Sequence, residues 1–426
     1  MKINFLYLNM LSEKLYKISI EGILNNCKSA RDNCLSGTML ASPSTSDPNY
    51  YFHWTRDSAL TALLLVRLLN KLPQYYKQIY DVICSYVFHE IATIQKNNKE
   101  YYAEPKYFVD GNRYDEPWGR PQNDGPAIRG YALVEFAFYQ LKNENTRFIE
   151  EHLVDFPNKK GILYSDFEFV AKNYDKTGFD VWEEVEGHHY FTSEFQYQFI
   201  KKFSQLATIF GDIDTQHKCR KVLVNMRKFL DKYYQNHWLS SVEVVNHSSE
   251  SRQWLDFANI LAYNYCNLFW SPFLHSHIGP TINEIAKQNI EKFGVQHNII
   301  LFGRYKEDMY YQGPPWILLT IGFAQWLKRV DKMIKTDPTI KQEDWFQNLQ
   351  QIIENVVFNE STSHDWIENN FSSLTTLYIR NMEKLLHIIH QKNNGFHESF
   401  YQQSLEGMSA NNLTWSYASY LHFFIE

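Results

Sequence analysis

The chain has 426 residues, of which 44% are hydrophobic and 21% charged, a balance that supports a large core and excludes a wholly disordered chain. Its 42 Lys and Arg residues stand against 48 Asp and Glu, and the net charge of -6 argues against a nucleic-acid-binding protein. No apolar run is long enough to span a membrane. Aromatic residues make up 16%, which fits either a thick core or a surface that stacks on sugars.

Helical periodicity dominates the chain. Apolar residues recur three and four positions apart over residues 9–25, 57–70, 73–96, 126–142, 162–174, 191–209, 214–234, 255–264, 281–293, 315–335, 342–358, 362–391 and 412–425. Alternating strand patterns are scarce, and no Pro-, Gly- or Ser-rich linker divides the chain. We therefore predict one all-α domain over residues 1–426. The number of helices suits a toroid of helical hairpins. An α-solenoid would also fit the number, but no fixed-period repeat is present.

The sequence fits a secreted protein and a cytoplasmic protein equally well. The first residues, Met1 to Leu8, carry one positive charge and a short apolar run without a clear cleavage site, so we expect a first helix rather than a signal peptide. None of the five cysteines forms a Cys-x-x-Cys pair, which argues against a structural zinc site. Cys27 and Cys34 could form a disulfide, but free thiols fit equally well.

The loops between the predicted helices carry Trp, Arg and carboxylates in place of ordinary turn residues. The first runs from Tyr50 to Ser58 and includes Trp54, Arg56 and Asp57. Capping of the following helix would explain a polar residue such as Asp57, but it would not explain the neighbouring aromatic residues and arginine. An adjacent Arg and Asp can donate to and accept from vicinal hydroxyls of a sugar.

A second loop, from Trp118 to Arg129, contains the turn Asn123-Asp124-Gly125-Pro126. Pro126 suits the first turn of a helix, and Arg129 would then be a structural ion-pair partner. Alternatively, Trp118 beside a glycine is a candidate stacking platform. Both interpretations fit this segment equally well.

The third and fourth loops each offer a catalytic carboxylate. Residues 178–187 hold four carboxylates around Trp182, and if these converge, the pKa of at least one carboxyl rises, as a general acid requires. A solvated acidic turn is the alternative. In residues 395–401, Glu398 stands alone among aromatic residues and could be a base or a hydrogen-bonded core residue. Glycoside hydrolysis needs two such carboxyl groups.

A fifth loop, residues 303–316, again combines Arg304 with acidic residues, Tyr310 and Trp316, although an internal salt bridge would explain part of it. The histidines do not form a metal-binding pattern. His275 and His277 have no third ligand nearby, His188-His189 is similar, and His89-Glu90 lacks the second histidine of a zincin motif. We therefore expect neither a metal nor a cofactor.

Taken together, these loops resemble the glucoamylases, the inverting exo-acting glucan hydrolases of glycoside hydrolase family fifteen. The similarity extends from about residue 38 to the C-terminus, with all blocks in the order of the family. The matching blocks are Ala41-Ser42-Pro43-Ser44, residues 50–60, Gly119 to Ala127, Trp182-Glu183-Glu184-Val185, Gly303 to Trp316, and Ser409-Ala410 with residues 413–418. The resemblance implies an (α/α)6 barrel with active-site loops at one end.

The resemblance implies that Glu183 is the general acid and Glu398 the catalytic base, roughly 6.5–9.5 Å apart as inversion requires. Arg56, Asp57 and Arg304 would hold the terminal glucose, and the carbonyl of Val181 would lie beside the acid. The expected substrate-binding residues are Tyr50, Trp54, Arg56, Asp57, Trp118, Gln122, Val181, Trp182, Glu184, Arg304, Tyr310 and Trp316. A polar contact, such as a Tyr hydroxyl, would keep Glu398 ionised.

The expected activity is hydrolysis of terminal α-1,4 bonds in starch- or glycogen-type glucans and maltooligosaccharides, with slower α-1,6 cleavage, by a monomer without a starch-binding domain. A related exo-specificity, resembling glucodextranase or trehalase, is the nearest alternative. A catalytically silent glucan-binding protein is another. The chain departs from the family at His188-His189, His397, Asn411-Asn412 and Val181. These departures affect chain-length preference and pH optimum rather than the reaction.

Overall fold

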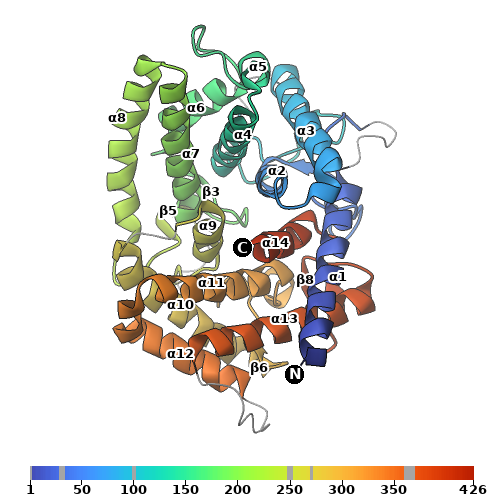
Figure 1. The fold of residues 1–426 in the computed structure, drawn as a ribbon. Helices are drawn as coiled ribbons and strands as arrows, with labels where there is room; N and C mark the ends of the chain where they lie inside the picture. The colour runs from blue at the N-terminus through green and yellow to red at the C-terminus, as the bar shows by residue number, and fades with distance from the viewer. Residues whose placement is uncertain (1, 28–33, 98–101, 247–252, 269–271, 359–369) are drawn as a thin grey trace. The chain divides into compact units, whose positions relative to one another are not determined.

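The computed structural model describes residues 2–27, 34–97, 102–246, 253–268, 272–358 and 370–426 (Figure 1). The chain forms two compact units, which are treated separately below. The N-terminal unit consists of Ile23–Tyr233 and Ser241–Glu250, and the C-terminal unit consists of Met1–Gly22, Tyr234–Ser240 and Ser251–Glu426. Within the described residues, no helix combines the length and apolar character needed to cross a membrane.

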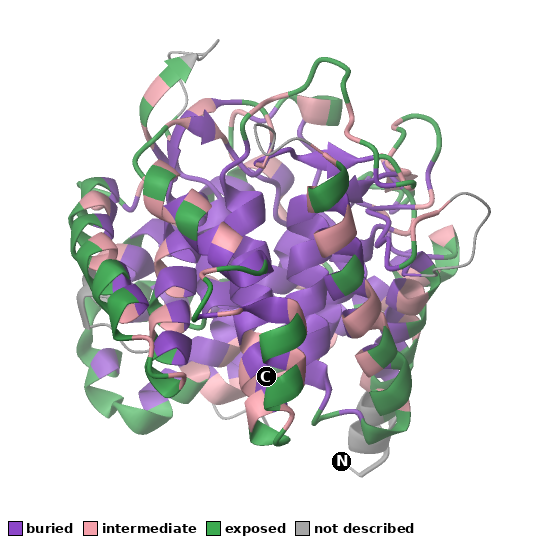
Figure 2. Cartoon of the chain, turned by 90° about the horizontal axis from the view of Figure 1, so that it is seen from above, coloured by how far each residue is buried: buried purple, intermediate pink, exposed green. Residues whose placement is uncertain are grey.

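The N-terminal unit is built on long helices. They are α2 (Thr55–Leu68), α3 (Tyr76–Lys96), α4 (Asp124–Lys142), α6 (Ile162–Asn173), α7 (Tyr190–Ile209) and α8 (Ile213–Leu230), with the short α5 (Thr146–Phe148). Helix α4 packs against α2, α6 and α7. Every residue of α2 except Arg67 is buried, which agrees with its nearly continuous apolar sequence. Figure 2 colours the chain by burial, with buried residues in purple.

Short strands position the loops of the N-terminal unit. Strands β1 (His53–Trp54) and β2 (Lys106–Tyr107) pair antiparallel, with Trp54 opposite Lys106. Strand β4 (Glu186–His189) pairs antiparallel with both β3 (Gly178–Phe179) and β5 (Ser241–Asn246). The β3–β4 hairpin carries the predicted acid loop, and β1 leads directly into α2. The hairpin and β1 therefore fix the backbone on both sides of the predicted acid site.

The C-terminal unit contains most of α1 (Lys2–Asn26) and a second set of helices. They are α9 (Ala258–Cys266), α10 (Pro272–Phe293), α11 (Ile317–Thr336), α12 (Asp344–Val357), α13 (Phe371–Asn393) and α14 (Thr414–Ile425). Helix α11 packs against α9, α13 and α14. Two short hairpins, β6 (Val295–Gln296) with β7 (Ile299–Ile300) and β8 (Ser399–Phe400) with β9 (Gly407–Met408), connect the helices. Glu398 directly precedes β8.

Each segment with helical periodicity coincides with a helix, and most ends agree within a few residues. The largest difference is α10, which begins nine residues before the predicted start and contains Pro280 in its interior. Residues 362–369 of the predicted segment 362–391 lie outside the described residues, and α13 begins at Phe371. All five cysteines are free thiols, including Cys27 and Cys34.

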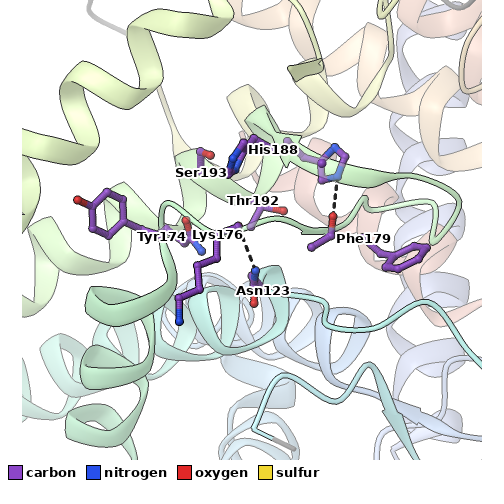
Figure 3. A pocket seen from close by; sticks show the side chains of 11 residues that line it. Asn123, Tyr174, Lys176, Phe179, His188, Thr192 and Ser193 are labelled. Atoms are coloured by element: carbon purple, nitrogen blue, oxygen red, sulfur yellow. Dashed lines mark hydrogen bonds between the residues drawn. The ribbon is translucent and has the colours of Figure 1, made fainter. Parts of the chain in front are cut away.

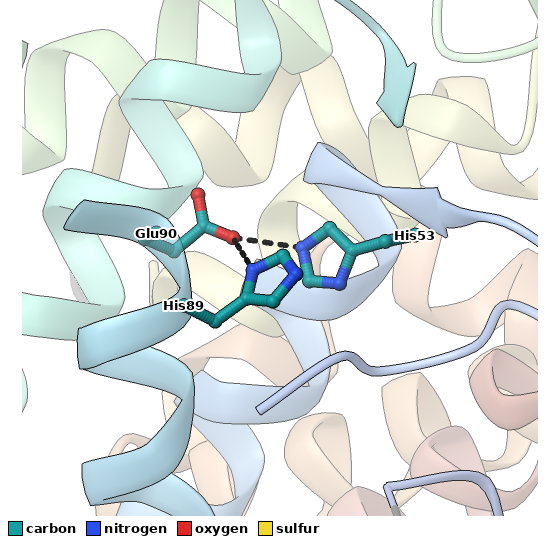
Figure 4. Close-up of side chains that lie close together, drawn as sticks. All are labelled: His53, His89 and Glu90. Atoms are coloured by element: carbon teal, nitrogen blue, oxygen red, sulfur yellow. Dashed lines mark hydrogen bonds and ion pairs between the residues drawn. The ribbon is translucent and has the colours of Figure 1, made fainter. Parts of the chain in front are cut away.

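A buried polar network anchors β1 to the helices behind it (Figure 4). The main-chain N–H of Met39 donates to Nδ1 of His53 at 3.0 Å, and Nε2 of His53 lies 2.7 Å from Oε1 of Glu90. Arg129 donates to the other oxygen of Glu90 at 2.9 Å and to both oxygens of Asp166. Arg129 is therefore a structural ion-pair partner. The network fixes the residue that immediately precedes Trp54.

The network predicts an acid-sensitive stability. Burial lowers the pKa of His53 from 6.5 to about 4, and the neighbouring His89 acts in the same direction. Below pH 6.5 the unfolded chain therefore binds a proton that the folded chain does not, so the free energy of unfolding falls as the pH falls toward 4. Between pH 7 and 4.5 this one residue removes about 2 kcal/mol. Urea unfolding of the wild type and His53→Gln measures the effect, and equal pH dependence in both proteins would contradict it.

Candidate active site

The acid loop is a tight turn closed by Asp180. The N–H of Asp180 donates to the carbonyl of Val185, and that of Glu183 donates to the carbonyl of Asp180, both at 2.9 Å. Oδ1 of Asp180 accepts the N–H groups of Glu184 and Val185 at 2.7 and 3.0 Å. Glu183 adopts a φ of +66°, which a non-glycine residue seldom does. The turn thus uses the Asp180 carboxylate to hold its backbone and to present Glu183.

The carboxylates of the acid loop have separate roles. Glu186 accepts a hydrogen bond from the Thr177 hydroxyl at 3.0 Å, and Glu184 is exposed. The side chain of Glu183 is only 14% exposed. Its Oε1 accepts from the indole of Trp54 at 2.8 Å and from Nη2 of Arg56 at 2.9 Å, and its Oε2 accepts from the indole of Trp118 at 2.8 Å. Two indole N–H groups and one guanidinium N–H group therefore donate hydrogen bonds to the carboxyl group of the predicted acid.

The guanidinium of Arg56 links Glu183 to two further carboxylates. Nη1 donates to the side-chain oxygen of Gln122 at 2.9 Å and to Asp124 at 3.2 Å, while Nε lies 3.6 Å from Asp57. Arg56 is only 5% exposed, so these contacts are poorly screened by water. Burial raises the pKa of Asp57 to about 6, against the opposing influence of Arg56. Asp57 therefore titrates within the range of a weakly acidic enzyme assay.

A buried lysine lies beneath the aromatic side of the same cluster. Nζ of Lys106 lies 3.2 Å from the ring centroid of Trp118 and 4.5 Å from that of Trp54, and the rings of Phe52 and Tyr114 complete the enclosure. Burial lowers the pKa of Lys106 to about 8, although the charge of Glu183 opposes the shift. Trp118 itself is 38% exposed. Its ring can therefore stack on a ligand while its N–H holds Glu183.

The other predicted residues of this unit surround the cluster less directly. The ring of Tyr50 packs 5.1 Å from that of Trp54. Val181 and Trp182 are buried in the acid loop, whereas Glu184 is exposed, and its backbone N–H binds Asp180. The structure thus groups Trp54, Arg56, Asp57, Trp118, Gln122 and Glu183 through direct contacts.

Glu398 occupies a comparable position in the C-terminal unit. The side chain is buried, its N–H donates to the carbonyl of Ala410 at 2.9 Å, and its Oε2 accepts a hydrogen bond from the hydroxyl of Ser409. The Tyr310 hydroxyl lies 3.2 Å from that of Ser409. A serine hydroxyl thus contacts Glu398 directly, and the Tyr310 hydroxyl lies next to that serine.

Arg304 is fixed in the same unit by a bidentate ion pair. Its Nε and Nη2 donate to the two oxygens of Asp308 at 2.9 and 2.6 Å. Its guanidinium carbon lies 5.0 Å from the ring centroid of Tyr310 and 5.4 Å from that of Trp316. The salt bridge expected for this loop is therefore present, and it holds the arginine against the two aromatic residues predicted to line the site.

Four contributing residues were absent from the predicted site: Lys106, Asp124, Asp308 and Ser409. Lys106 begins strand β2, and its pairing with Trp54, which is distant in sequence, brings it under the aromatic rings. An aspartate is common at the start of a helix, so nothing in the sequence indicated that Asp124 also contacts Arg56. Asp308 and Ser409 both lie in loops that the sequence analysis singled out. The sequence did not indicate that Asp308 would contact Arg304 or that Ser409 would contact Glu398.

The histidines after the acid loop are structural in part. Nδ1 of His189 lies 2.8 Å from the hydroxyl of Ser241, and its Nε2 lies 3.0 Å from the carbonyl of Gly178, so it joins β3, β4 and β5. His188 pairs with Glu243 at 3.3 Å. Behind the hairpin lies a small pocket with a cavity volume of about 10 Å³ (Figure 3). Of the residues that contact Arg56 or Glu183, none lines this pocket.

His53, His89 and Glu90 form the one group of described residues whose atoms lie close enough together to hold a metal ion. The hydrogen bonding of His53 does not suit this role. Its Nδ1 accepts the N–H of Met39, so a neutral ring carries its proton on Nε2, the atom that faces Glu90. A metal-binding histidine instead donates from the nitrogen that does not face the metal. The group fits a structural hydrogen-bond network better than a metal site.

The model of the family described as glycosyl hydrolases family 15 matches residues 17–424, so the chain belongs to this family. The chain is 28% identical over 430 residues to glucoamylase-1 of Schizophyllum commune, a match that covers 94% of this chain and 71% of that protein. It is 27% identical over 406 residues to a probable glucoamylase of Schizosaccharomyces pombe, with 91% and 84% covered.

The fold matches the solved glucoamylase of Saccharomycopsis fibuligera with a TM-score of 0.80 at 24% identity, covering 98% of this chain and 94% of that one. The predicted all-α (α/α)6 barrel is thereby confirmed as the fold class. Family membership together with the glucoamylase relatives identifies the chain as a glycoside hydrolase of the glucoamylase type.

The position of Lys106 predicts a spectroscopic titration. Above its pKa of about 8, the side chain loses a positive charge that lies 3.2 Å from the Trp118 ring, so the tryptophan emission is expected to change with a midpoint near pH 8. The Lys106→Met variant should lack this step. Lys202→Met is the matched control, because Lys202 lies over Tyr131 and Phe138 rather than a tryptophan. An unchanged titration in Lys106→Met would show that another group causes it.

Proposed function

We propose that this chain is an exo-acting glucan 1,4-α-glucosidase. It would remove β-D-glucose from the non-reducing ends of starch- or glycogen-type glucans and maltooligosaccharides, cleave α-1,6 bonds more slowly, and invert the configuration at the anomeric carbon. The observation that supports this proposal most is the shielded carboxyl group of Glu183, which faces two indoles and an arginine. Aromatic rings beside a hydrogen-bonding carboxyl group suit the apolar and polar faces of a sugar.

In the proposed reaction, Glu183 gives a proton to the glycosidic oxygen as the bond to the anomeric carbon breaks. Glu398 takes a proton from the water that attacks the opposite face, and the product therefore has the inverted configuration. The hydrogen bond from Ser409 keeps an acceptor oxygen of Glu398 oriented and favours its ionised form. Both carboxyl groups return to their starting states after the product leaves and the proton is exchanged with solvent.

The remaining predicted residues would bind the sugar. Arg56, Asp57 and Arg304 are proposed to hold the hydroxyls of the terminal glucose, and the grip on that end would restrict attack to chain ends. The carbonyl of Val181 is proposed to lie beside the acid. The other proposed contacts are Tyr50, Trp54, Trp118, Gln122, Trp182, Glu184, Tyr310 and Trp316. His188, held by Glu243, is proposed to influence the more distant sugar units.

Experiments can distinguish two alternative functions from this proposal. A different linkage preference would be revealed by comparing release of glucose from maltotetraose, isomaltose and trehalose. Cleavage of trehalose alone would contradict the glucan assignment. A silent glucan-binding protein would bind maltooligosaccharides without hydrolysing any of them, but the two retained carboxyl groups favour catalysis over this alternative.

The acid and base roles predict opposite behaviour with an activated substrate. Glu183→Gln and Glu398→Gln should each lower kcat on maltose by a factor on the order of 10² or more. α-D-Glucosyl fluoride carries a leaving group that needs no proton, so Glu183→Gln should retain most of its activity on this substrate. Glu398→Gln should lose it, because water still requires a base. Equal losses of fluoride hydrolysis in both variants would contradict the assignment of roles.

The hydroxyl beside Glu398 predicts a shift in the acidic limb of the pH profile. The Ser409→Gly variant removes the donor and suits the φ of +59° at this position. Without that donor the carboxylate binds a proton more readily, so the acidic limb of kcat/KM should move up by as much as about one pH unit. Asn394→Gly is the control, because it also places glycine at a positive φ, 52°, in this unit. A shift shared by both variants would count against the Ser409 contact.

A further inference from the structure

Asp124 is a buried carboxylate in the acid cluster to which the proposed reaction assigns no role. It is the first residue of α4 and is 0% exposed. Its Oδ2 accepts from Nη1 of Arg56 at 3.2 Å, while Nη2 of the same guanidinium donates to Glu183 at 2.9 Å. The two carboxylates thus contact the two terminal nitrogens of one arginine. A helix-capping role alone would not require this contact.

The charges of the cluster are unbalanced around Arg56. One guanidinium faces the carboxylates of Asp57, Asp124 and Glu183, at 3.6, 3.2 and 2.9 Å. Because all of these groups are largely removed from water, the charge on any one of them affects the proton affinity of the others. Burial raises the pKa of Asp124, and Arg56 opposes this effect. Lys106 is a second cation whose charge interacts with that of Glu183.

We propose that Asp124 is a positioning residue that sets the pH range in which Glu183 acts as the acid. It does so by orienting Arg56 and by taking up part of its positive charge, which leaves less of that charge to stabilise the ionised form of Glu183. The acid therefore keeps its proton to a higher pH. This inference rests on the proposed function, in which Glu183 is the proton donor.

Gln122 offers a substitution with the opposite electrostatic effect. Its side-chain oxygen accepts from the same Nη1 of Arg56, at 2.9 Å. Asp124→Asn removes a negative charge from this nitrogen, and Gln122→Glu adds one, in each case with little change in side-chain shape. The two variants therefore test how negative charge beside Nη1 of Arg56 affects the pH profile, one by removing a charge and the other by adding one.

The experiment is the pH dependence of kcat/KM for maltose, whose alkaline limb reports loss of the acid's proton in the free enzyme. In Asp124→Asn the limb should move to lower pH by about 0.5–1 unit, and in Gln122→Glu it should move to higher pH by a similar amount. The position of the limb does not depend on the concentration of active enzyme, so partial misfolding does not obscure it. Repeating the profiles in Lys106→Arg removes the lysine that titrates at about 8.

Asp166→Asn is the matched control. Asp166 is also a fully buried carboxylate paired with a buried arginine in the N-terminal unit, but its partner is Arg129. This variant should be less stable, with the limb unchanged. An unmoved limb in both Asp124→Asn and Gln122→Glu, or a shift in the same direction in both, would overturn the inference. If Glu183→Gln instead keeps wild-type activity on maltose, the proposed acid itself is wrong, and the two failures remain distinct.

Discussion

The acid side of the candidate site depends on a single buried guanidinium. Arg56 can remain charged with little contact with water only because carboxylates and an amide oxygen surround it. Its planar fork reaches α2, the start of α4 and the acid loop at the same time. Helix α4 begins at Asp124 and the acid loop turns at Glu183, and both of these residues contact Arg56. The local backbone and the electrostatics of the acid are therefore fixed by one set of contacts.

A buried arginine is held by a carboxylate in the C-terminal unit as well. Asp308 holds Arg304 through two parallel hydrogen bonds, and the rings of Tyr310 and Trp316 lie against the guanidinium. Such an arginine keeps its donors in one orientation without relying on surface side chains. Glu398 accepts a hydrogen bond from the hydroxyl of Ser409. Within each unit, contacts inside the protein thus already hold these candidate residues in one orientation.

The sequence predicted the helices well because their faces repeat apolar residues over many turns. The predicted segment 281–293 began nine residues after the true start of α10, and Pro280 lies inside that helix. Glu183, Glu398 and the arginines were predictable from the resemblance of their loops to a family. Asp124 and Lys106 were not, because their roles arise from contacts with Arg56 and Trp118, which are distant in sequence. The four carboxylates of the acid loop also looked alike in sequence, and only the folded turn separates the backbone cap Asp180 from Glu183.

The central claim is that one carboxyl group donates a proton while a second activates water on the opposite face of the sugar. The most direct measurement is ¹H NMR of the anomeric proton during the first minutes of maltose hydrolysis, before mutarotation mixes the two forms. The account predicts that the glucose released from the non-reducing end appears first as the β-anomer. Initial release of α-glucose from that end would contradict it, because retention requires a covalent intermediate rather than direct attack by water.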